Sequence, residues 1–321
     1  MLLRRAALIV LLGFVAGAPH AETYPAKPIR LIVPTSPGAA TDIYARLVAD
    51  HLDRAFGEHV VVENKGGAGG ALGADIIAKA APDGHTIGLM QMGVVAILPW
   101  VVKDLPFDAL NDLLPVAMIG DAPQILAIND KLPVRSVGEL IAYAKANPGK
   151  LNYGSSGPGA PPHLIGVMFG KSAGIEIVHV PYRGVAPAVV DLAAGQVQMV
   201  FASLSSFQAQ LKAGTVRLLA VTRATRVRAL PDLPTIAEAG LPDFEATSWF
   251  GVFTTKGTPE PVVAALNREI NALLDQPDAA RRFVEMGLEP AKLAPAEFAA
   301  RVRRDNQRWG AMIRAANIKP D

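Results

Sequence analysis

The sequence predicts an α/β protein of two lobes with mostly parallel sheets, and three observations point to this fold class. Short apolar runs typical of strands alternate with helical patterns along nearly the whole chain, which indicates βαβ crossovers and parallel sheets. The chain has 321 residues, more than a single hydrophobic core usually serves. Two segments, around Ala122–Gln124 and Glu245–Ser248, have the character of crossings between lobes.

These two crossings set the expected domain organisation. We assign residues 22–123 together with residues 248–321 to the first lobe, and residues 124–247 to the second. A double crossing between two α/β lobes is a hinge, and such a hinge predicts closure around a ligand. Ligands of sheets of this kind bind at the carboxyl ends of the strands.

Apolar runs bounded by turn residues define the expected strands, and apolar residues at helical spacing define the helices. The strands are expected at Ile29–Val33, Val60–Glu63, Thr86–Met90, Ala117–Ile119, Ile125–Ile128, Leu151–Gly154, Ile177–Val180, Val197–Ala202, Val216–Val221 and Thr247–Phe253. The helices are expected after the first strand, at Ala71–Ala80, Ser136–Asn147, Pro162–Ser172, Val185–Ala194 and Phe207–Ala213, and over most of the remainder.

Two of these helices carry additional signals. Ser136 can cap its helix with Glu139 three residues on, and Pro148 stops that helix. In the C-terminal helix, four large apolar residues recur at helical spacing and are expected to face the core. They are Phe298, Val302, Trp309 and Ile313.

The first residues have the pattern of a secretory signal. Arg4 and Arg5 precede an apolar run from Ala6 to Ala18, which is shorter than the roughly 20 residues of a membrane-spanning helix. We expect cleavage after Ala21, so that residues 1–21 are the signal peptide and the mature protein is exported to the periplasm. The chain has no cysteine, which is compatible with an oxidising compartment.

Charge argues against several classes of partner. The whole chain has 31 basic and 29 acidic residues, and the signal removes two arginines and no acid. The mature protein is therefore formally neutral, which gives no electrostatic case for binding nucleic acid or an anionic membrane.

A turn of small residues between the first strand and the first helix is the first candidate ligand site. Peptide N–H groups at a helix N-terminus lack partners and lie at the positive end of the helix dipole, so they bind anions readily. The candidate contacts are the amides and hydroxyls of Thr35, Ser36, Gly38, Ala39, Ala40 and Thr41. The alternative is an ordinary βα turn in which Thr41 or Asp42 caps the helix; Asp42 itself is expected to support the turn, since a carboxylate repels an anion.

A second turn, after the strand Leu151–Gly154, repeats this chemistry in the other lobe. Its candidate contacts are Ser155, Ser156 and Gly157, because Pro161 and Pro162 have no N–H to offer. Two amide clusters on facing lobes are able to hold the ends of a solute that carries carboxylates.

Four further side chains are candidates, each with an alternative. His163 either orients Ser155 or touches solute, and Tyr182 either lines the cleft or packs against the hinge. Arg183 either pairs with a distal carboxylate or is a solvated surface residue. Ser203 follows the strand Val197–Ala202 and is a weaker candidate of the same kind as the serines of the second turn.

Motifs for cofactor binding and catalysis are incomplete. The glycine run from Gly67 has Leu72 where the dinucleotide fingerprint needs its third glycine, so we interpret the run as a tight turn or part of the cleft wall. Ser155 and Ser156 do not lie in a Gly-x-Ser-x-Gly motif, and no metal-ligand spacing is present. We therefore expect no cofactor, no metal and no enzymatic activity.

Several segments in a fixed order resemble the Bug-type substrate-binding proteins of tripartite tricarboxylate transporters. The segments are Tyr24–Pro34, Pro37-Gly38 with Asp42 and Arg46, Val60–Asn64, Gly67–Gly70, Ala81–Gly84, Tyr153–Gly157, His163-Leu164, His179–Gly184, Asp191-Leu192, Pro231–Thr235 and Glu238–Pro242. The resemblance implies the type II periplasmic-binding architecture, with a small carboxylate held between the lobes by backbone amides and bridging water. This chain departs from the family's first loop by having Thr35 in place of an aromatic residue and Ala39 in place of a glycine.

The expected function is that of an exported, monomeric solute receptor. It binds a small organic carboxylate between its lobes and delivers it to the subunits of a membrane permease. Two alternatives stay open: a periplasmic serine hydrolase that uses Ser155 or Ser156 with His163, and a sensor that signals to a membrane partner.

Overall fold

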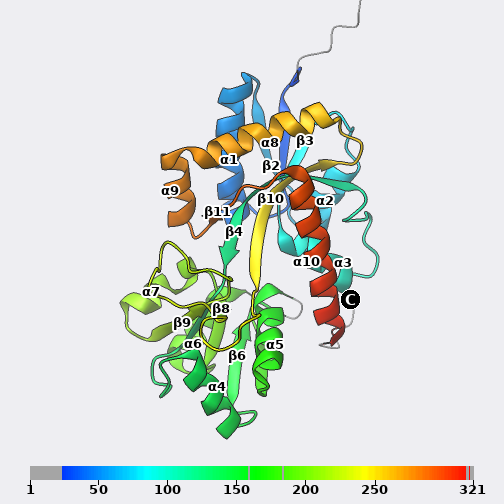
Figure 1. The fold of residues 1–321 in the computed structure, drawn as a ribbon. Coiled ribbons are helices and arrows are strands. Elements are labelled where there is room, and N and C mark those ends of the chain that lie inside the picture. The colour runs from blue at the N-terminus through cyan, green and yellow to red at the C-terminus, as the bar shows by residue number, and fades with distance from the viewer. Residues whose placement is uncertain (1–23, 158–159, 183, 316–317, 319–321) are drawn as a thin grey trace, which may run out of the picture.

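The computed structural model describes residues 24–157, 160–182, 184–315 and 318. They form two lobes, each built around one β-sheet and joined by two long crossing segments (Figure 1). The predicted signal peptide and Arg183 lie outside the described residues. Within the described ranges, no helix combines the length and the apolar character needed to span a bilayer.

The first lobe contains a six-stranded sheet in the order β11-β4-β10-β3-β1-β2. Its strands are β1 (Ile29–Val33), β2 (Val60–Asn64), β3 (Thr86–Gln91), β4 (Leu113–Pro123), β10 (Thr247–Thr255) and β11 (Glu289–Pro290). Its helices are α1 (Ala40–Phe56), α2 (Ala71–Ala78), α3 (Leu98–Val101), α8 (Glu260–Asp275), α9 (Pro277–Glu285) and α10 (Pro295–Ala315), with the short helical turns η1 (Ala68–Gly70) and η2 (Gly93–Ile97).

The second lobe contains a five-stranded sheet in the order β7-β6-β8-β5-β9. Its strands are β5 (Ile125–Asn129), β6 (Leu151–Ser155), β7 (Ile177–Pro181), β8 (Met199–Ala202) and β9 (Val216–Val221). Its helices are α4 (Val137–Ala146), α5 (Pro161–Ala173), α6 (Val185–Ala194) and α7 (Gln208–Lys212), and the turn η3 (Leu204–Phe207) precedes α7.

Both sheets are mixed, because each contains a strand that enters from the other lobe. The predicted parallel pairing is present between β1, β2 and β3 and between β6, β7 and β8. In contrast, β10 runs antiparallel to β3 and β4, and β5 runs antiparallel to β8 and β9. A strand that begins at the hinge must run opposite to the strands that end there.

The chain passes between the sheets where two strands lie side by side. β4 ends at Pro123, which pairs with Thr247 at the start of β10, and β5 begins two residues later at Ile125. The Thr222 hydroxyl ties both passages together, since it donates to Ala246 O and the Gln124 amide donates to it at 3.1 Å. The crossing is therefore held by the backbone pairing of β4 with β10 and by the Thr222 hydroxyl.

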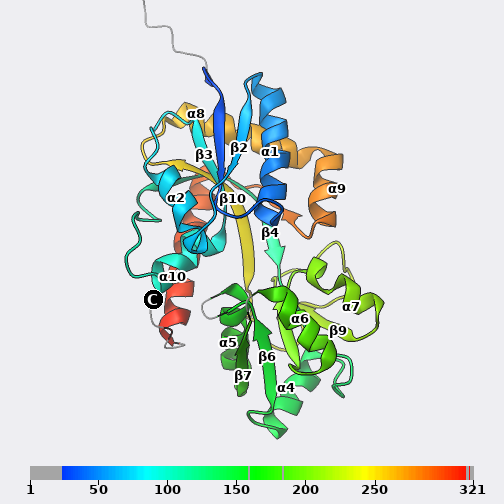
Figure 2. The same ribbon diagram turned by 180° about the vertical axis from the view of Figure 1, so that it is seen from behind.

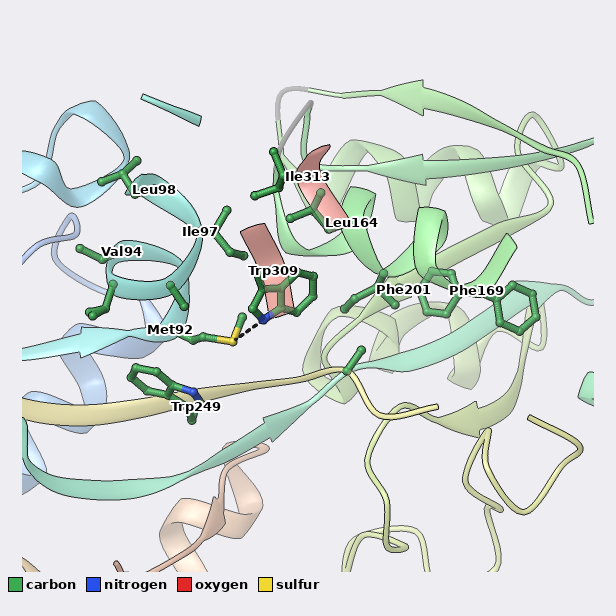
Figure 3. Close-up of a cluster of buried hydrophobic side chains, with 14 of the residues drawn as sticks. Met92, Val94, Ile97, Leu98, Leu164, Phe169, Phe201, Trp249, Trp309 and Ile313 are labelled. Atoms are coloured by element: carbon green, nitrogen blue, oxygen red, sulfur yellow. Dashed lines mark hydrogen bonds between the residues drawn. The ribbon is translucent and has the colours of Figure 1, made fainter. Parts of the chain in front are cut away.

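An apolar cluster continues from one lobe into the other along α10. Figure 3 shows Trp309 and Ile313 of α10 between Met92 and Ile97 of the first lobe and Leu164 of the second, with the Trp309 indole N–H donating to Met92 Sδ at 3.1 Å. The predicted core-facing stripe of the C-terminal helix is confirmed, since all four residues are buried. α10 also reaches α5 directly, where Lys171 Nζ donates to Ala315 O at 3.0 Å.

Several elements departed from the expected pattern, and two of them have a clear physical reason. η2 (Gly93–Ile97) is a π-helical turn whose residues from Val94 to Ile97 are all apolar and buried, so it has no polar face to reveal its period. β4 is 11 residues long, whereas only Ala117–Ile119 was expected as strand, because Pro115 and Pro123 interrupt the apolar run. Because β4 and β10 are long and pair with each other up to Pro123 and Thr247, they form a continuous crossing between the lobes.

Candidate functional site

The direction of the strands brings the two predicted turns to edges that face each other across the hinge. In the first sheet, Gln91 at the end of β3 pairs with Phe250, close to the start of β10 at the crossing. In the second sheet, Ala202 at the end of β8 pairs with Ile125, the first residue after the crossing. The carboxyl ends of β1 and β3 therefore point toward the second lobe, and those of β6 and β8 point toward the first (Figure 2).

The first turn presents an uncapped helix N-terminus. α1 begins at Ala40, so the amides of Ala40, Thr41 and Asp42 have no acceptor inside the helix. Ala39 occupies the N-cap position, and its side chain has no oxygen to accept them. Ala40 is exposed, whereas Thr41 is buried, with 2 % of the residue's surface exposed.

Asp42 holds this turn in shape. Its carboxylate accepts from the Gly38 amide at 2.8 Å and from Asn64 Nδ2 at 3.0 Å, and it pairs with Arg46 at 3.0 Å. Although burial opposes ionisation, the Gly38, Arg46 and Asn64 contacts together keep the pKa of Asp42 below its ordinary value. These contacts agree with the predicted supporting role of Asp42. They also mean that the Gly38 amide already donates to Asp42 within the turn.

The glycine run forms a wall beside the first turn. A Cβ at Gly66 would lie 3.3 Å from the Ser36 nitrogen, and a Cβ at Gly73 would lie 2.7 Å from Pro34 Cβ. The predicted tight turn with close backbone packing is confirmed. Thr35 Oγ1 is buried next to this wall and has no hydrogen-bond partner among the described residues, whereas Ser36 is exposed.

The second turn is organised around the Ser155 hydroxyl. Ser155 is 1 % exposed, and its Oγ lies 3.1 Å from Gly157 N, 3.1 Å from Gly157 O and 2.6 Å from His179 Nε2. Gly157 has a φ of 126°, a conformation that favours glycine. Ser155 and Gly157 thus shape the turn from inside, and Ser156 lies half-buried between them.

Two stacked histidines lie beneath this turn. The rings of His163 and His179 have centroids 3.9 Å apart at an interplanar angle of 21°, and Tyr153 packs beside them. Burial lowers the pKa of His163, and burial together with His163 lowers the pKa of His179 to about 4. Both rings are therefore neutral at pH 7.

One of the two roles expected for His163, orienting Ser155, belongs to His179. His179 lies on β7, in register with Tyr153 of β6, so the fold brings it to Ser155 from a strand 24 residues away. His163 is 9 % exposed and stacks behind His179. Sequence reasoning missed His179 because its role depends on the pairing of two strands.

Tyr182 and Ser203 follow β7 and β8 at the carboxyl ends of these strands in the second sheet. The Tyr182 hydroxyl donates to Asp191 Oδ2 at 2.7 Å, and burial and Asp191 raise the pKa of Tyr182 to about 12. A Cβ at Gly154 would lie 3.2 Å from the Tyr182 ring, so this side chain packs on the sheet and is partly buried. The Ser203 hydroxyl lies 3.0 Å from those of Ser205 and Ser206 at the end of β8.

This arrangement does not support the alternative of a serine hydrolase. Ser155 does contact a histidine, but its hydroxyl is buried, and Asp191 pairs with Tyr182 instead of supporting His179. Among the residues that the structure describes, no group of three or more His, Cys, Asp or Glu side chains is placed to hold a metal ion.

The family described as the tripartite tricarboxylate transporter family receptor matches residues 44–318. The chain belongs to this family. Its solute receptors are periplasmic, and the tripartite transporters that they serve have membrane subunits. The resemblance to Bug-type proteins is confirmed, since the receptor is 37 % identical to Protein BugT of Bordetella pertussis over 306 residues, which cover 95 % of this chain and 94 % of that protein.

Solved structures show the same two-lobe architecture. The receptor is similar to Rpa4515 of R. palustris with adipate, at 37 % identity and a TM-score of 0.79, over 93 % of this chain and all of that one. It is also similar to MatC of Rhodopseudomonas palustris with bound malate, at 30 % identity and a TM-score of 0.73, over 90 % of this chain and all of that one.

Proposed function

We propose that this receptor closes its two lobes around a small organic carboxylate and passes it to the membrane subunits of a tripartite transporter. The observation that carries this proposal is the placement of two amide-bearing turns, at Ser36–Thr41 and Ser155–Gly157, on sheet edges that face each other across the hinge. Adipate and malate, which two structural relatives bind, are both dicarboxylates, and this supports the ligand class.

The chemistry of the first turn supports an anionic ligand. The amides of Ala40 and Thr41 lie at the positive end of the α1 dipole, and Ala39 leaves them without a capping oxygen. The nearest carboxylate, Asp42, is tied to Gly38, Asn64 and Arg46 and is partly neutralised by that arginine. A carboxylate that docks here replaces water on donors that the fold leaves unpaired.

In the second lobe, we propose that the Ser156 amide and hydroxyl, Tyr182, Arg183 and Ser203 contact the other end of the solute. Charge-assisted hydrogen bonds contribute roughly 1.5–3 kcal/mol each. Four or five of them support micromolar binding, about −8 kcal/mol, after ordering and closure costs.

The lobes that close are residues 22–123 with 248–321, and residues 124–247. This proposal places the boundary within the paired crossing of Pro123 with Thr247. We further propose export to the periplasm through residues 1–21, and delivery of the solute by a monomeric receptor without catalysis.

A thermal-shift screen tests the proposed ligand class. The mature receptor is heated with mono-, di- and tricarboxylates and with neutral and cationic analogues of similar size. A ligand at one hundred times its dissociation constant adds about 2.7 kcal/mol, which for a protein of this size raises Tm by several degrees. A shift produced only by the neutral or cationic compounds would contradict the proposal.

A further inference from the structure

The hydroxyl of Ser155 joins His179 to the second turn. Ser155 Oγ lies 2.6 Å from His179 Nε2, and it lies 3.1 Å from both the N and the O of Gly157. Ser155 is buried at the carboxyl end of β6, and its carbonyl accepts from the Tyr182 amide at 3.0 Å. The Ser155 hydroxyl oxygen therefore connects β7, an edge strand, to the turn that precedes α5.

A hydroxyl has a single proton, and this limits the possible hydrogen-bond patterns. The Gly157 N–H can only donate, so it donates to Ser155 Oγ. When His179 Nε2 carries no proton, the hydroxyl donates to it. When Nε2 is protonated, the ring must donate, and the hydroxyl proton turns to Gly157 O. The protonation state of His179 thus sets the orientation of the hydroxyl beneath the turn.

We propose that His179 is a positioning residue of the ligand site, which acts through Ser155 to hold the Gly157 turn and thereby the Ser156 donors. The proposal rests on the proposed function, since Ser156 must face the solute for the positioning to matter. His179 itself lies under the turn and is not proposed to contact the solute.

The surroundings of His179 favour the neutral ring that this role requires. α5 contributes His163, stacked at 3.9 Å, and β6 contributes Tyr153 at 5.1 Å together with Ser155. These are the titratable and polar groups that face the ring in the described part of the chain. Burial and His163 hold the pKa of His179 at about 4, so the ring is neutral at pH 7, and in the tautomer protonated at Nδ1 its Nε2 accepts from Ser155.

Binding of adipate, measured by calorimetry at pH 7, tests the role of the ring. His179→Leu removes the acceptor and is expected to weaken binding about tenfold, whereas His179→Gln, which keeps an acceptor of similar reach, stays within about threefold of the original receptor. His51→Leu is the matched control, since His51 is a buried histidine of α1 in the other lobe whose ring contacts Gln276. It is expected to leave affinity unchanged.

A double-mutant cycle shows whether His179 acts through Ser155. Ser155→Ala alone is expected to weaken adipate binding about as much as His179→Leu, and combining the two is expected to add little. Additive losses would overturn the proposal, because they would mean that His179 acts independently of the hydroxyl. Equal affinity of His179→Leu and the original receptor would overturn it as well.

A measurement without ligand separates this inference from the proposed function. In the original receptor, the NMR signal of the Gly157 amide should move as pH falls through about 4, and in His179→Gln it should stay in place. Superimposable titrations of the two proteins would refute the positioning role. Failure of the original receptor to bind adipate would count against that acid as ligand, and the titration would still decide on His179, even if His179→Leu does not fold.

Discussion

Replacement of Ala40 by proline removes one peptide N–H from the first turn and is compatible with the local backbone. Ala40 is the first residue of α1, a position where proline is tolerated because the N–H has no partner inside the helix. The preceding residue, Ala39, has φ −68° and ψ 158°, the extended conformation that a following proline requires. Ala40 is exposed, so the proline ring does not enter the core.

The expected loss follows from the bond that the amide makes. A hydrogen bond to a charged group contributes about 1.5–3 kcal/mol, so its removal should weaken carboxylate binding by roughly 10- to 150-fold. The free energy of unfolding should change by less than about 0.5 kcal/mol, because no packed side chain is altered. This variant is thus expected to lose affinity for the carboxylate while keeping its stability.

Isothermal titration with adipate measures the affinity, and urea denaturation measures the stability. Glu260→Pro is the matched control, since Glu260 is the first residue of α8 and also follows an extended residue, Pro259, with ψ 140°. α8 follows β10 at the end of the sheet away from the crossing, so this control should bind as the original receptor does. A folded Ala40→Pro variant with unchanged affinity would refute the role assigned to the first turn.

Three further predictions concern stability. Trp309→Ala should lower the free energy of unfolding by about 3–5 kcal/mol, because it opens a cavity in the cluster between the lobes; a loss below 1 kcal/mol in urea denaturation would contradict this packing. Asp121→Ala should lower the free energy of unfolding by about 3 kcal/mol, because it leaves the largely buried Arg301 guanidinium, 2.6 Å away, without its main partner; an unchanged urea midpoint would contradict this role of the ion pair. Because His179 has a pKa of about 4 in the folded state and about 6.5 when unfolded, the unfolded chain binds more protons between these values, so stability should fall as pH drops from about 6.5 to about 4. The free energy of unfolding should fall by about 1–2 kcal/mol over this pH range after allowance for the partial exposure of His179. If the stability of His179→Gln depends on pH as steeply as that of the original receptor, the loss does not come from His179.

Segments with a regular spacing of apolar residues, or with turn or capping residues at their ends, were predictable from the sequence. The stripe of α10, the capped start of α4 at Ser136 and the strands that end at the two turns have local causes, namely apolar spacing and turn chemistry. The Ser136 side chain accepts from the Glu139 amide at 3.1 Å, as expected. The π-helical η2 was not predictable, because a segment buried on every side leaves no amphipathic pattern.

The site was predictable as a set of turns but not as a network. Small residues after strands indicated where unpaired amides would lie, and the topology places those turns on facing edges. Which hydrogen-bond donors and acceptors already have partners within each turn depends on contacts between distant residues. Asn64 donates to Asp42, and His179 is hydrogen-bonded to Ser155. Such pairings follow from strand register, which sequence spacing alone does not determine.

A crystal structure of the receptor with adipate tests the central claim most directly. We expect one carboxylate within hydrogen-bond distance of the Ala40 and Thr41 amides and the other end of the solute at the Ser156 turn, with the lobes closed over it. Adipate bound away from both turns, or held mainly by side-chain cations, would contradict this account.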